Sequence, residues 1–576
     1  MADRVEKLDT LLTKFTRWFE SFCHDGREML EEAERACDYR DGHQLTDRQI
    51  RALKKRNQPP VVYNRIKRKI DYLVGLEKQQ RTDPKALPRT PQHEQDAHAA
   101  TDALRYQNET HNYDKARSRA WFDLISVGWG GTQKLLQQKQ DGSVDWETVQ
   151  TPWDRMWWDI HSSEHDFSDA NYLGTVRWLD FEEALHEYGG KHRDALETAK
   201  REAYRDEHST FEDKPKNVWY DRANNRIRLC QVFYKERGYW RFAEFTKGAI
   251  LRGGVSPFPD KDGIPHHPYQ WRTAYIDRQN CRFGLIRELF DPQDEVNKRR
   301  SKLLHALNSQ KTFGRRSAVV DEARFKAEMA KPNGHVTIGD DARWGEDVGI
   351  ITDGADVAGH AQLLAEAKSE IDLLGPNAAL QGKQDGSMSG KALQTQQQGG
   401  FIELSGLLDD LRDMDQANYR LDWLLIRKYW TQPKWIRVTD DPKNVKFVGL
   451  NAPYQDPQTG EVRMVSVADL DVDIWIEDAP NMVELEGEQF EHVVGLAQAG
   501  VIFPPQVYIE LAPNIRNKDK LLEAIQQQQR AAAQAPNPEL EMEVAKTKAD
   551  VEKKQAETQK TQVETAAMYA RGAMGV

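Results

Sequence analysis

Residues 284–316 read GLIRELFDPQDEVNKRRSKLLHALNSQKTFGRR and predict a long helix over residues 284–312. Acids lie in its first part, and no acid stands between Val296 and Arg316. Acids early and bases late complement the helix dipole, so a well-formed surface helix accounts for the pattern. The functional interpretation is a helix that presents positive charge to phosphates. The basic residues concerned are Lys298, Arg299, Arg300, Lys302, Lys311, Arg315 and Arg316.

No aromatic side chain is interleaved with the bases of this helix, so stacking on nucleic-acid bases is not implied. Any contact with nucleic acid would go to the phosphate backbone and would be independent of base sequence. The stretch alone leaves both interpretations open.

On the C-terminal side of this stretch, turn signals divide the chain into shorter elements. The loop at residues 375–392 is rich in Gly, Gln and Ser and lacks periodicity, which predicts a mobile connection between two helices. The helix after it should soften at Gly399-Gly400. The expected elements are strand Ser317–Val320, helix Glu322–Ala330, strand His335–Ile338, helix 357–374, helix 393–430, strands within 434–478, helices within 487–528 and a polar helical tail at about 539–571.

On the N-terminal side, helices come first and aromatic-rich strands follow. The Pro59-Pro60 pair should end the helical region 1–57. Alternating apolar and polar positions at 217–275 predict an antiparallel meander. The other expected elements are an amphipathic helix at 64–76, one helix from Glu94 to Val127, strands within 129–178 and a helix at 180–206. The predicted fold class is α+β, mainly helical.

Composition excludes several classes of protein. The 576 residues carry a net charge of -11, which excludes a uniformly basic nucleic-acid coat but allows a local basic stripe. The 16 Trp, 18 Tyr and 19 Phe argue against disorder throughout. No apolar run reaches the ~18 residues that span a bilayer, and the N-terminus MADRVEKLDT lacks the apolar region of a signal peptide. The four cysteines form no CxxC pair and are expected as free thiols in a reducing cytosol.

The motifs of catalysis and metal binding are absent or incomplete. A phosphate-binding loop needs Gly-x4-Gly-Lys-Ser/Thr, but Gly382-Lys383 is followed by Gln384 and has the wrong glycine spacing. His161 and His165 are four apart, yet the serines and aspartates around them favour a polar surface turn over a metal clamp. The Asp469-Leu470-Asp471-Val472-Asp473 run lacks the Gly and Glu of a calcium loop and fits an acidic strand face. We therefore expect no enzyme, no cofactor and no metal.

Three segments, taken in their order, resemble a known family. They are Gln58–Pro91 (QPPVVYNRIKRKIDYLVGLEKQQRTDPKALPRTP), Trp157–Tyr172, and Gly284–Gln310 with DPQDEVNKR at 291–299. Their order, with a long helix, a small αβ insert, a returning helix, a Gly/Gln loop and a further long helix, is similar to the portal proteins of tailed bacteriophages, especially short-tailed ones. The resemblance covers roughly residues 45–500.

The resemblance implies a portal fold with wing, stem, clip and crown regions, assembled as a ring of about twelve subunits at one capsid vertex. The regions map as wing 1–283 and 431–510, stem helix 284–312, clip 313–356, returning stem helix 357–374, tunnel loop 375–392, kinked channel helix 393–430, and crown or helical tail 511–576.

The resemblance also implies function and partners. Double-stranded DNA would pass through the ring without base-specific contacts, and a separate terminase would hydrolyse ATP. The other implied partners are tail adaptor, major capsid and scaffolding proteins. The protein would be made in the host cytoplasm, would reside in the virion and would contact no membrane. The candidate DNA-channel residues are Lys383, Lys391, Lys298, Arg299, Arg300 and Lys302. The last four lie on the stem helix, where some are expected to face the channel and some to pair with a neighbour's acids such as Glu288 or Asp294.

Two alternatives stay open. One is a different phage structural component, either an adaptor or a scaffold, although adaptors are shorter and scaffolds are poorer in Trp. The other is a nucleic-acid packaging enzyme, which would need a nucleotide-binding motif or a clustered acid–lysine site that does not stand out here.

Overall fold

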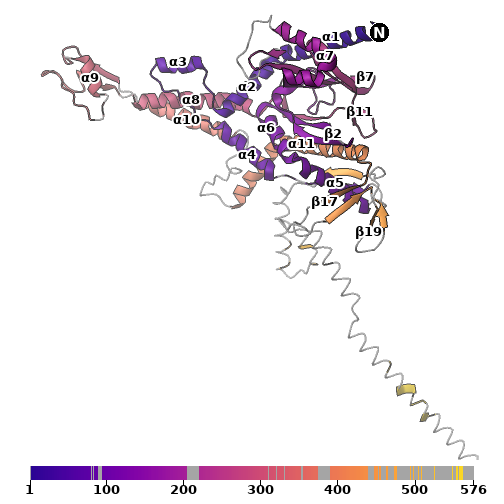
Figure 1. The fold of residues 1–576 in the computed structure, drawn as a ribbon. Helices are drawn as coiled ribbons and strands as arrows, with labels where there is room; N and C mark the ends of the chain where they lie inside the picture. The colour runs from indigo at the N-terminus through magenta and orange to yellow at the C-terminus, as the bar shows by residue number, and fades with distance from the viewer. Residues whose placement is uncertain are drawn as a thin grey trace, which may run out of the picture. The chain divides into compact units, whose positions relative to one another are not determined.

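A computed structural model describes residues 2–476 apart from internal gaps, and a few isolated residues beyond 476. The longer gaps are 89–93, 204–218, 309–310, 352–353, 374–389, 439–445, 456–461 and 465–471. Some single residues elsewhere in 2–476 are also not described. The chain divides into two compact units, Met1–Glu477 and Asp478–Val576. The helices and strands of the first unit are labelled in Figure 1.

Four helices open the chain, as predicted for its N-terminal part. Gly26 stands between the first two, and a Cβ there would lie 2.7 Å from the carbonyl oxygen of Phe22. Gly42 ends the second helix with φ 94°, a left-handed conformation that glycine adopts without strain. The helices are α1 (Ala2–Asp25), α2 (Arg27–Asp41), α3 (Asp47–Lys55) and α4 (Ile66–Gln79).

The prediction of a single helix from Glu94 to Val127 is wrong, because the segment forms two helices. α5 (Glu94–His111) and α6 (Tyr113–Val127) are separated at Asn112, which takes the left-handed φ of 50°. Asn is one of the few residues that tolerate this conformation, so the break costs little. Gly128 then ends α6 with φ 103°.

Antiparallel sheets follow, and they confirm the predicted strands and meander. One sheet has the order β12-β2-β3, and a larger one has β4-β5-β7-β8-β9 with β6 paired to β7. The strands of these sheets are β2 (Trp129–Gln138), β3 (Val144–Gln150), β4 (Met156–Trp158), β5 (Tyr172–Asp180), β6 (Tyr220–Asp221), β7 (Arg226–Glu236), β8 (Tyr239–Thr246), β9 (Ala249–Val255) and β12 (Tyr269–Thr273). Helix α7 (Phe181–Ala203) stands between β5 and β6. Two short ribbons pair β10 (Phe258–Pro259) with β11 (Pro265–His266), and β13 (Tyr275–Ile276) with β14 (Arg282–Phe283).

Aromatic side chains fill the core between the sheets and the N-terminal helix α1. Phe15 of α1 packs with its ring 4.9 Å from Tyr234 and 5.6 Å from Phe245, so α1 covers the larger sheet. Burial of rings this large supplies much of the hydrophobic stabilisation. The fully buried tryptophans are Trp121, Trp129, Trp146, Trp157, Trp158 and Trp271.

Two long helices project from this body and lie side by side in Figure 1. They are α8 (Ile286–Asn308) and α10 (Gly354–Leu373), and between them stand β15 (Lys311–Gly314), α9 (Glu322–Met329) and β16 (Val348–Ile351). We call residues 286–373 the arm. Helix α8 ends at Asn308, short of the predicted 312, because Lys311 already pairs with Ile351 in the β15–β16 ribbon.

The αβ segment within the arm corrects the sequence prediction. The predicted strands Ser317–Val320 and His335–Ile338 are wrong, whereas the predicted helix is confirmed as α9. The chain turns at Ala318, whose amide donates to the carbonyl of Arg315 at 2.9 Å. Ala318 is buried with Phe325 and Val348, so its apolar character serves a small core and not a strand.

The second half of the unit contains one long helix and further ribbons. Helix α11 runs from Gly390 to Tyr429, three residues earlier than the predicted 393, and Figure 1 shows its first part at an angle to the rest. The predicted strands are confirmed as β17 (Lys434–Val438), β18 (Lys446–Leu450), β19 (Pro453–Gln455), β20 (Val462–Met464) and β21 (Val472–Ile476), and β21 pairs with β1 (Pro84–Pro88). The predictions for 487–528 and 539–571 lie almost wholly outside the described residues.

Candidate functional site

A stripe of four polar side chains on α8 holds the segment 57–65 along the helix. Residues 293, 297, 301 and 305 are four apart, and that spacing places them on one face. Sequence reasoning missed this stripe, although the spacing of four was its visible signal. The contacts are Gln293 Oε1 with the amide of Arg65 at 3.1 Å, Asn297 Oδ1 with the amide of Tyr63 at 2.9 Å, Ser301 Oγ with the amide of Val61 at 3.4 Å, and His305 Nδ1 with the carbonyl of Asn57 at 3.1 Å.

The basic residues predicted on α8 differ in how far their charge is already paired. Lys298 lies 3.6 Å from Asp294, and Arg299 lies 2.9 Å from Glu295, one turn earlier on the same helix. Such pairs are worth only about 0.3–0.5 kcal/mol, so they leave most of the charge available. Thus Asp294, expected as a partner from a neighbouring subunit, has partners within its own chain.

Arg300 and Lys302 are the more available cations of α8. The Arg300 guanidinium stands 4.8 Å from the ring centroid of Tyr63, a cation–π contact that leaves its N–H groups able to donate. Lys302 is exposed and has no ion pair within the described part of the chain. The structure therefore places Lys298, Arg299, Arg300 and Lys302 on one helix, at different degrees of neutralisation.

Helix α10 returns antiparallel to α8 and makes polar contacts with α8 and with the chain at α4. Arg299 Nη1 lies 3.1 Å from His360 Nδ1, and at the other end Arg65 lies 2.9 Å from Asp372. Lys69 also donates to the Asp372 carbonyl at 3.4 Å. These contacts join α4 to α10 at the base of the arm, where α4 lies beside the arm helices α8 and α10.

A buried network of charges joins α11 to the rest of the unit. Arg117 Nε lies 2.8 Å from Asp415, the Tyr113 hydroxyl donates to the same carboxylate at 2.7 Å, and Arg117 also pairs with Glu77. Burial raises the pKa of Asp415, and the Arg117 guanidinium opposes that shift. Breaking one partner of such a network leaves an uncompensated buried charge, so the network fixes α11 in place.

A second buried pair lies two turns further along α11. Lys134 Nζ lies 2.6 Å from Asp422, and the indole of Trp146 donates to the other carboxylate oxygen at 2.7 Å. Burial lowers the pKa of Lys134, and Asp422 opposes the shift. Sequence reasoning missed both networks, since nothing in the local pattern distinguishes a buried Asp on a helix from a solvated one.

The remaining predicted site residues belong to the loop at 375–392. Lys383 lies outside the described residues, and Lys391 lies in the first turn of α11, where only the main chain is described. Neither lysine side chain is therefore placed relative to the bases of α8.

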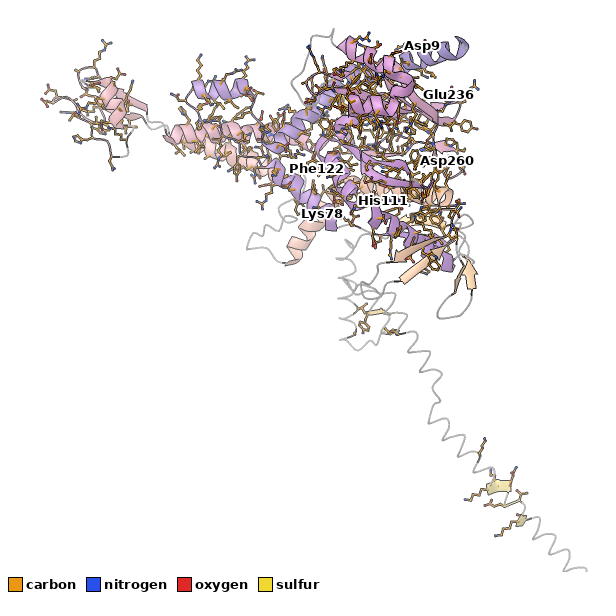
Figure 2. All side chains as sticks on the ribbon, viewed as in Figure 1. Asp9, Lys78, His111, Phe122, Glu236 and Asp260 are labelled. Carbon is orange, nitrogen blue, oxygen red and sulfur yellow. The ribbon has the colours of Figure 1, made fainter. Side chains whose placement is uncertain are left out.

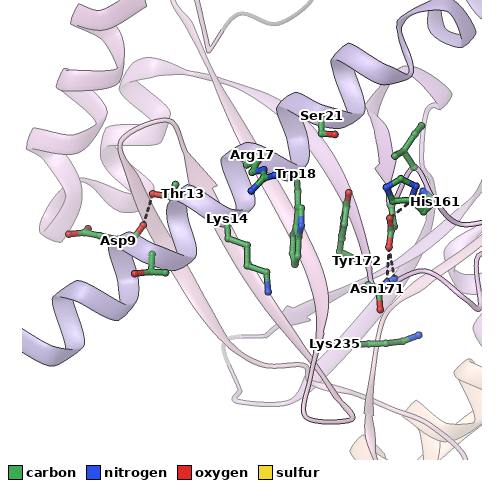
Figure 3. Close-up of a pocket in the computed structure, with 13 residues that line it drawn as sticks. Asp9, Thr13, Lys14, Arg17, Trp18, Ser21, His161, Asn171, Tyr172 and Lys235 are labelled. Atoms are coloured by element: carbon green, nitrogen blue, oxygen red, sulfur yellow. Dashed lines mark hydrogen bonds between the residues drawn. The ribbon is translucent and has the colours of Figure 1, made fainter.

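A groove of 1060 Å³ opens beside α1, shown in Figure 3. The Trp18 ring stacks on Tyr172 with centroids 4.2 Å apart, and Lys14 Nζ stands 4.5 Å from the Trp18 ring. Asp159, which also lines the groove, is buried and accepts from Asn171 Nδ2 at 2.9 Å. The groove has aromatic and basic walls, and its described residues form no constellation of catalytic groups.

The two histidines considered as a metal clamp do not form one. His161 lines the groove beside α1, whereas His165 Nδ1 lies 2.8 Å from the carbonyl of Thr273. The segment is a turn, as predicted. Among the described residues no group of three His, Cys, Asp or Glu side chains could hold a metal ion, and no described helix is long and apolar enough to cross a membrane.

Comparison with known proteins decides what this arrangement belongs to. The phage P22-like portal protein family matches residues 16–568. The chain belongs to this family. It is also 22% identical over 444 residues to the portal protein of Helicobacter pylori bacteriophage KHP30, a match that covers 77% of this chain and 70% of that protein. The predicted portal resemblance is thereby confirmed.

Membership of the portal family fixes the coarse function. The protein is a phage structural component, and the family is not an enzymatic one, which agrees with the sequence expectation. Portal proteins assemble as oligomeric rings with capsid and packaging partners, so the arm and its bases belong to a subunit of an assembly in the virion.

Proposed function

We propose that this portal protein forms a closed ring of about twelve subunits at one capsid vertex, through which the genome is packaged and ejected. The ring would dock terminase during packaging and tail or adaptor proteins afterwards, and it would contact major capsid and scaffolding proteins at its rim. Synthesis would take place in the host cytoplasm.

The regions of the subunit follow from the resemblance. Helix α8 and helix α10 would be the stem, the ribbon and helix between them the clip, and α11 the channel helix. The wing would comprise 1–283 and 431–510, the tunnel loop 375–392, and the crown 511–576. The antiparallel pairing of α8 with α10, closed at the far end by the β15–β16 ribbon, is the observation that carries this assignment.

The charge on α8 suits a channel in which DNA must slide. Arg300 and Lys302 offer phosphate contacts without any side chain built to read a base, and Lys298 and Arg299 are partly neutralised. Weak, interchangeable contacts to phosphate let DNA move, whereas tight or base-specific contacts would hold it. Lys383 of the loop and Lys391 of the first turn of α11 would add transient contacts at the narrowest point.

Electron microscopy of the purified full-length protein tests this function. The expected particle is a ring with a central hole wide enough for a DNA duplex. DNA association by the ring should weaken as salt rises and should not discriminate between sequences. Preferential binding of one sequence, or binding insensitive to salt, would contradict the sliding-channel role.

A further inference from the structure

Helix α3 is tied to α8 at both of its ends. Before the helix, Gln44 Oε1 accepts from Asn297 Nδ2 at 2.6 Å, and Gln44 Nε2 donates to the carbonyl of Tyr39 at 2.8 Å. After the helix, the Asn57 carbonyl lies 3.1 Å from His305 Nδ1. A capping box at Thr46 and Gln49 sets where the helix begins. The position of α3 beside α8 is thus specified, although the helix itself is not packed into the fold.

Every residue of α3 is described, and none is buried. Helices shorter than about 12–15 residues are marginal in water unless an apolar face is covered by a partner. Ile50 and Leu53, three apart, are neither fully buried nor fully exposed, and Figure 2 shows side chains of α3 that point away from α8. Its cations, none with an ion pair in the described part of the chain, are Arg48, Arg51, Lys54, Lys55 and the C-cap residue Arg56.

Helix α10 carries a complementary surface. Gly359, Leu363, Glu366, Glu370 and Leu373 recur at intervals of three and four and are all exposed, so they form one stripe. Leu363 is 38% exposed and Leu373 is 73% exposed, which is unusual for leucines on a helix that packs against another. Neither glutamate has an ion pair in the described part of the chain, in contrast to Asp372, which Arg65 neutralises.

Helices α3 and α10 lie on opposite sides of α8 in Figure 1, so they do not meet within one subunit. A ring requires heterologous contacts, in which one side of a subunit meets the opposite side of the next. We propose that α3 of one subunit docks on the Leu363–Glu366–Glu370–Leu373 stripe of α10 in the neighbouring subunit. The proposal rests on the proposed ring assembly and names the surfaces that close it.

The apolar residues favour a second copy of this chain over nucleic acid as the partner. Phosphates would pair with the bases of α3 but would leave Ile50 and Leu53 partly exposed and Leu373 in water. A neighbouring α10 offers carboxylates to the bases and leucines to the apolar positions at once. Charge complementarity of this kind sets register and partner choice at an interface.

Zero-length carbodiimide cross-linking of assembled wild-type rings tests the contact directly. Rings assembled from an equal mixture of isotopically light and heavy chains should give peptides that join Lys54 or Lys55 to Glu366 or Glu370, about half of them of mixed isotope. Cross-links of these residues confined to single chains, or their absence from rings that cross-link elsewhere, would overturn the proposal.

Charge reversal gives an independent test. The Lys54→Glu/Lys55→Glu variant and the Glu366→Lys/Glu370→Lys variant should each lower the fraction of chains in rings about tenfold, since like charges then face each other. A single chain that carries all four substitutions should assemble again, because opposite charges face each other once more. The control is Lys261→Glu/Arg278→Glu, which reverses two exposed cations outside the arm and should assemble normally.

The outcomes separate this proposal from the ring function. If the wild-type protein forms no ring, the proposed function itself is contradicted. Rings that form equally well in all variants overturn only the α3–α10 contact. Rings that form normally while the α3 variant loses DNA association would assign α3 to phosphates instead. Circular dichroism melts of each variant verify that the fold is kept.

Discussion

Arg117 forms one of the two buried ion pairs that hold α11 in place. It joins Asp415 and Glu77 in a buried network, and truncation would leave Asp415 without a cation and Glu77 with Arg81 alone. Arg117→Met should lower the free energy of unfolding by about 3–5 kcal/mol, measured by urea denaturation. Lys115→Met, an exposed base on the same helix, should change it by less than about 0.5 kcal/mol. Equal effects of the two substitutions would contradict the role given to the network.

Asp123 should make the stability of the protein depend on pH. Burial raises its pKa to about 7, although Gln150 and the amide of Trp153 donate to it and oppose the shift. Because the folded state holds this proton more tightly than the unfolded state, the stabilisation is complete below pH 4 and is lost as the pH rises to 7. Over that range the contribution falls by roughly 4 kcal/mol.

The substitution Asp123→Asn tests this pH dependence, because an amide keeps the size of the side chain and cannot ionise. The fall in unfolding free energy between pH 4 and pH 7 should be smaller in the variant than in the wild type. The exposed carboxylate of Asp262 provides the control through Asp262→Asn. Identical pH profiles for the wild type and Asp123→Asn would refute the assignment.

At the scale of elements, Gly128 stands between α6 and β2, where the chain just before α8 packs closely against it. Its φ is 103°, and a Cβ there would lie 2.0 Å from the carbonyl carbon of Phe283, which closely precedes α8. Gly128→Ala should therefore destabilise the protein by more than about 3 kcal/mol, roughly the sum of backbone strain and a steric clash, as measured by urea denaturation. Gly142→Ala is the matched control, since φ there is 83° but nothing lies within 4 Å of the added Cβ. It should cost only about 1 kcal/mol.

Sequence reasoning was most reliable for elements whose signal is local. The periodicity and charge order of residues 284–312 predicted α8, and alternation predicted β7 and β8. It failed in the segment after α8, where Ala318 looked like part of a strand. The true strands β15 and β16 are 34 residues apart between Gly314 and Val348, and a pairing over such a distance leaves no local trace.

The candidate site shows the same division. The sequence placed Lys298, Arg299, Arg300 and Lys302 together, because spacing along one helix is a local property. The spacing of four between Asp294 and Lys298 and between Glu295 and Arg299 is an equally local signal, which the prediction did not use. The burial of Asp415 and Asp422 has no such local signal. Partners from residues 77, 117 and 134 decide those states, and only the folded chain brings them near α11.

At the scale of the whole molecule, the loop at 375–392 should govern the passage of DNA and not the assembly of the ring. The double variant Lys383→Glu/Lys391→Glu should form rings at the wild-type level and slow DNA packaging or retention, because the two proposed phosphate contacts per subunit would become repulsive. Lys383→Gln/Lys391→Gln should have a smaller effect, since it removes attraction without adding repulsion. Packaging at the wild-type rate after deletion of residues 378–389 would show that the loop is only a connection.

The central claim is that this chain is a ring-forming portal subunit, and native mass spectrometry of the full-length protein measures this most directly. The expected result is a closed species at about twelve times the 66.4 kDa subunit mass, seen by electron microscopy as a ring with a central hole. A stable monomer or dimer at every salt concentration tested would contradict it.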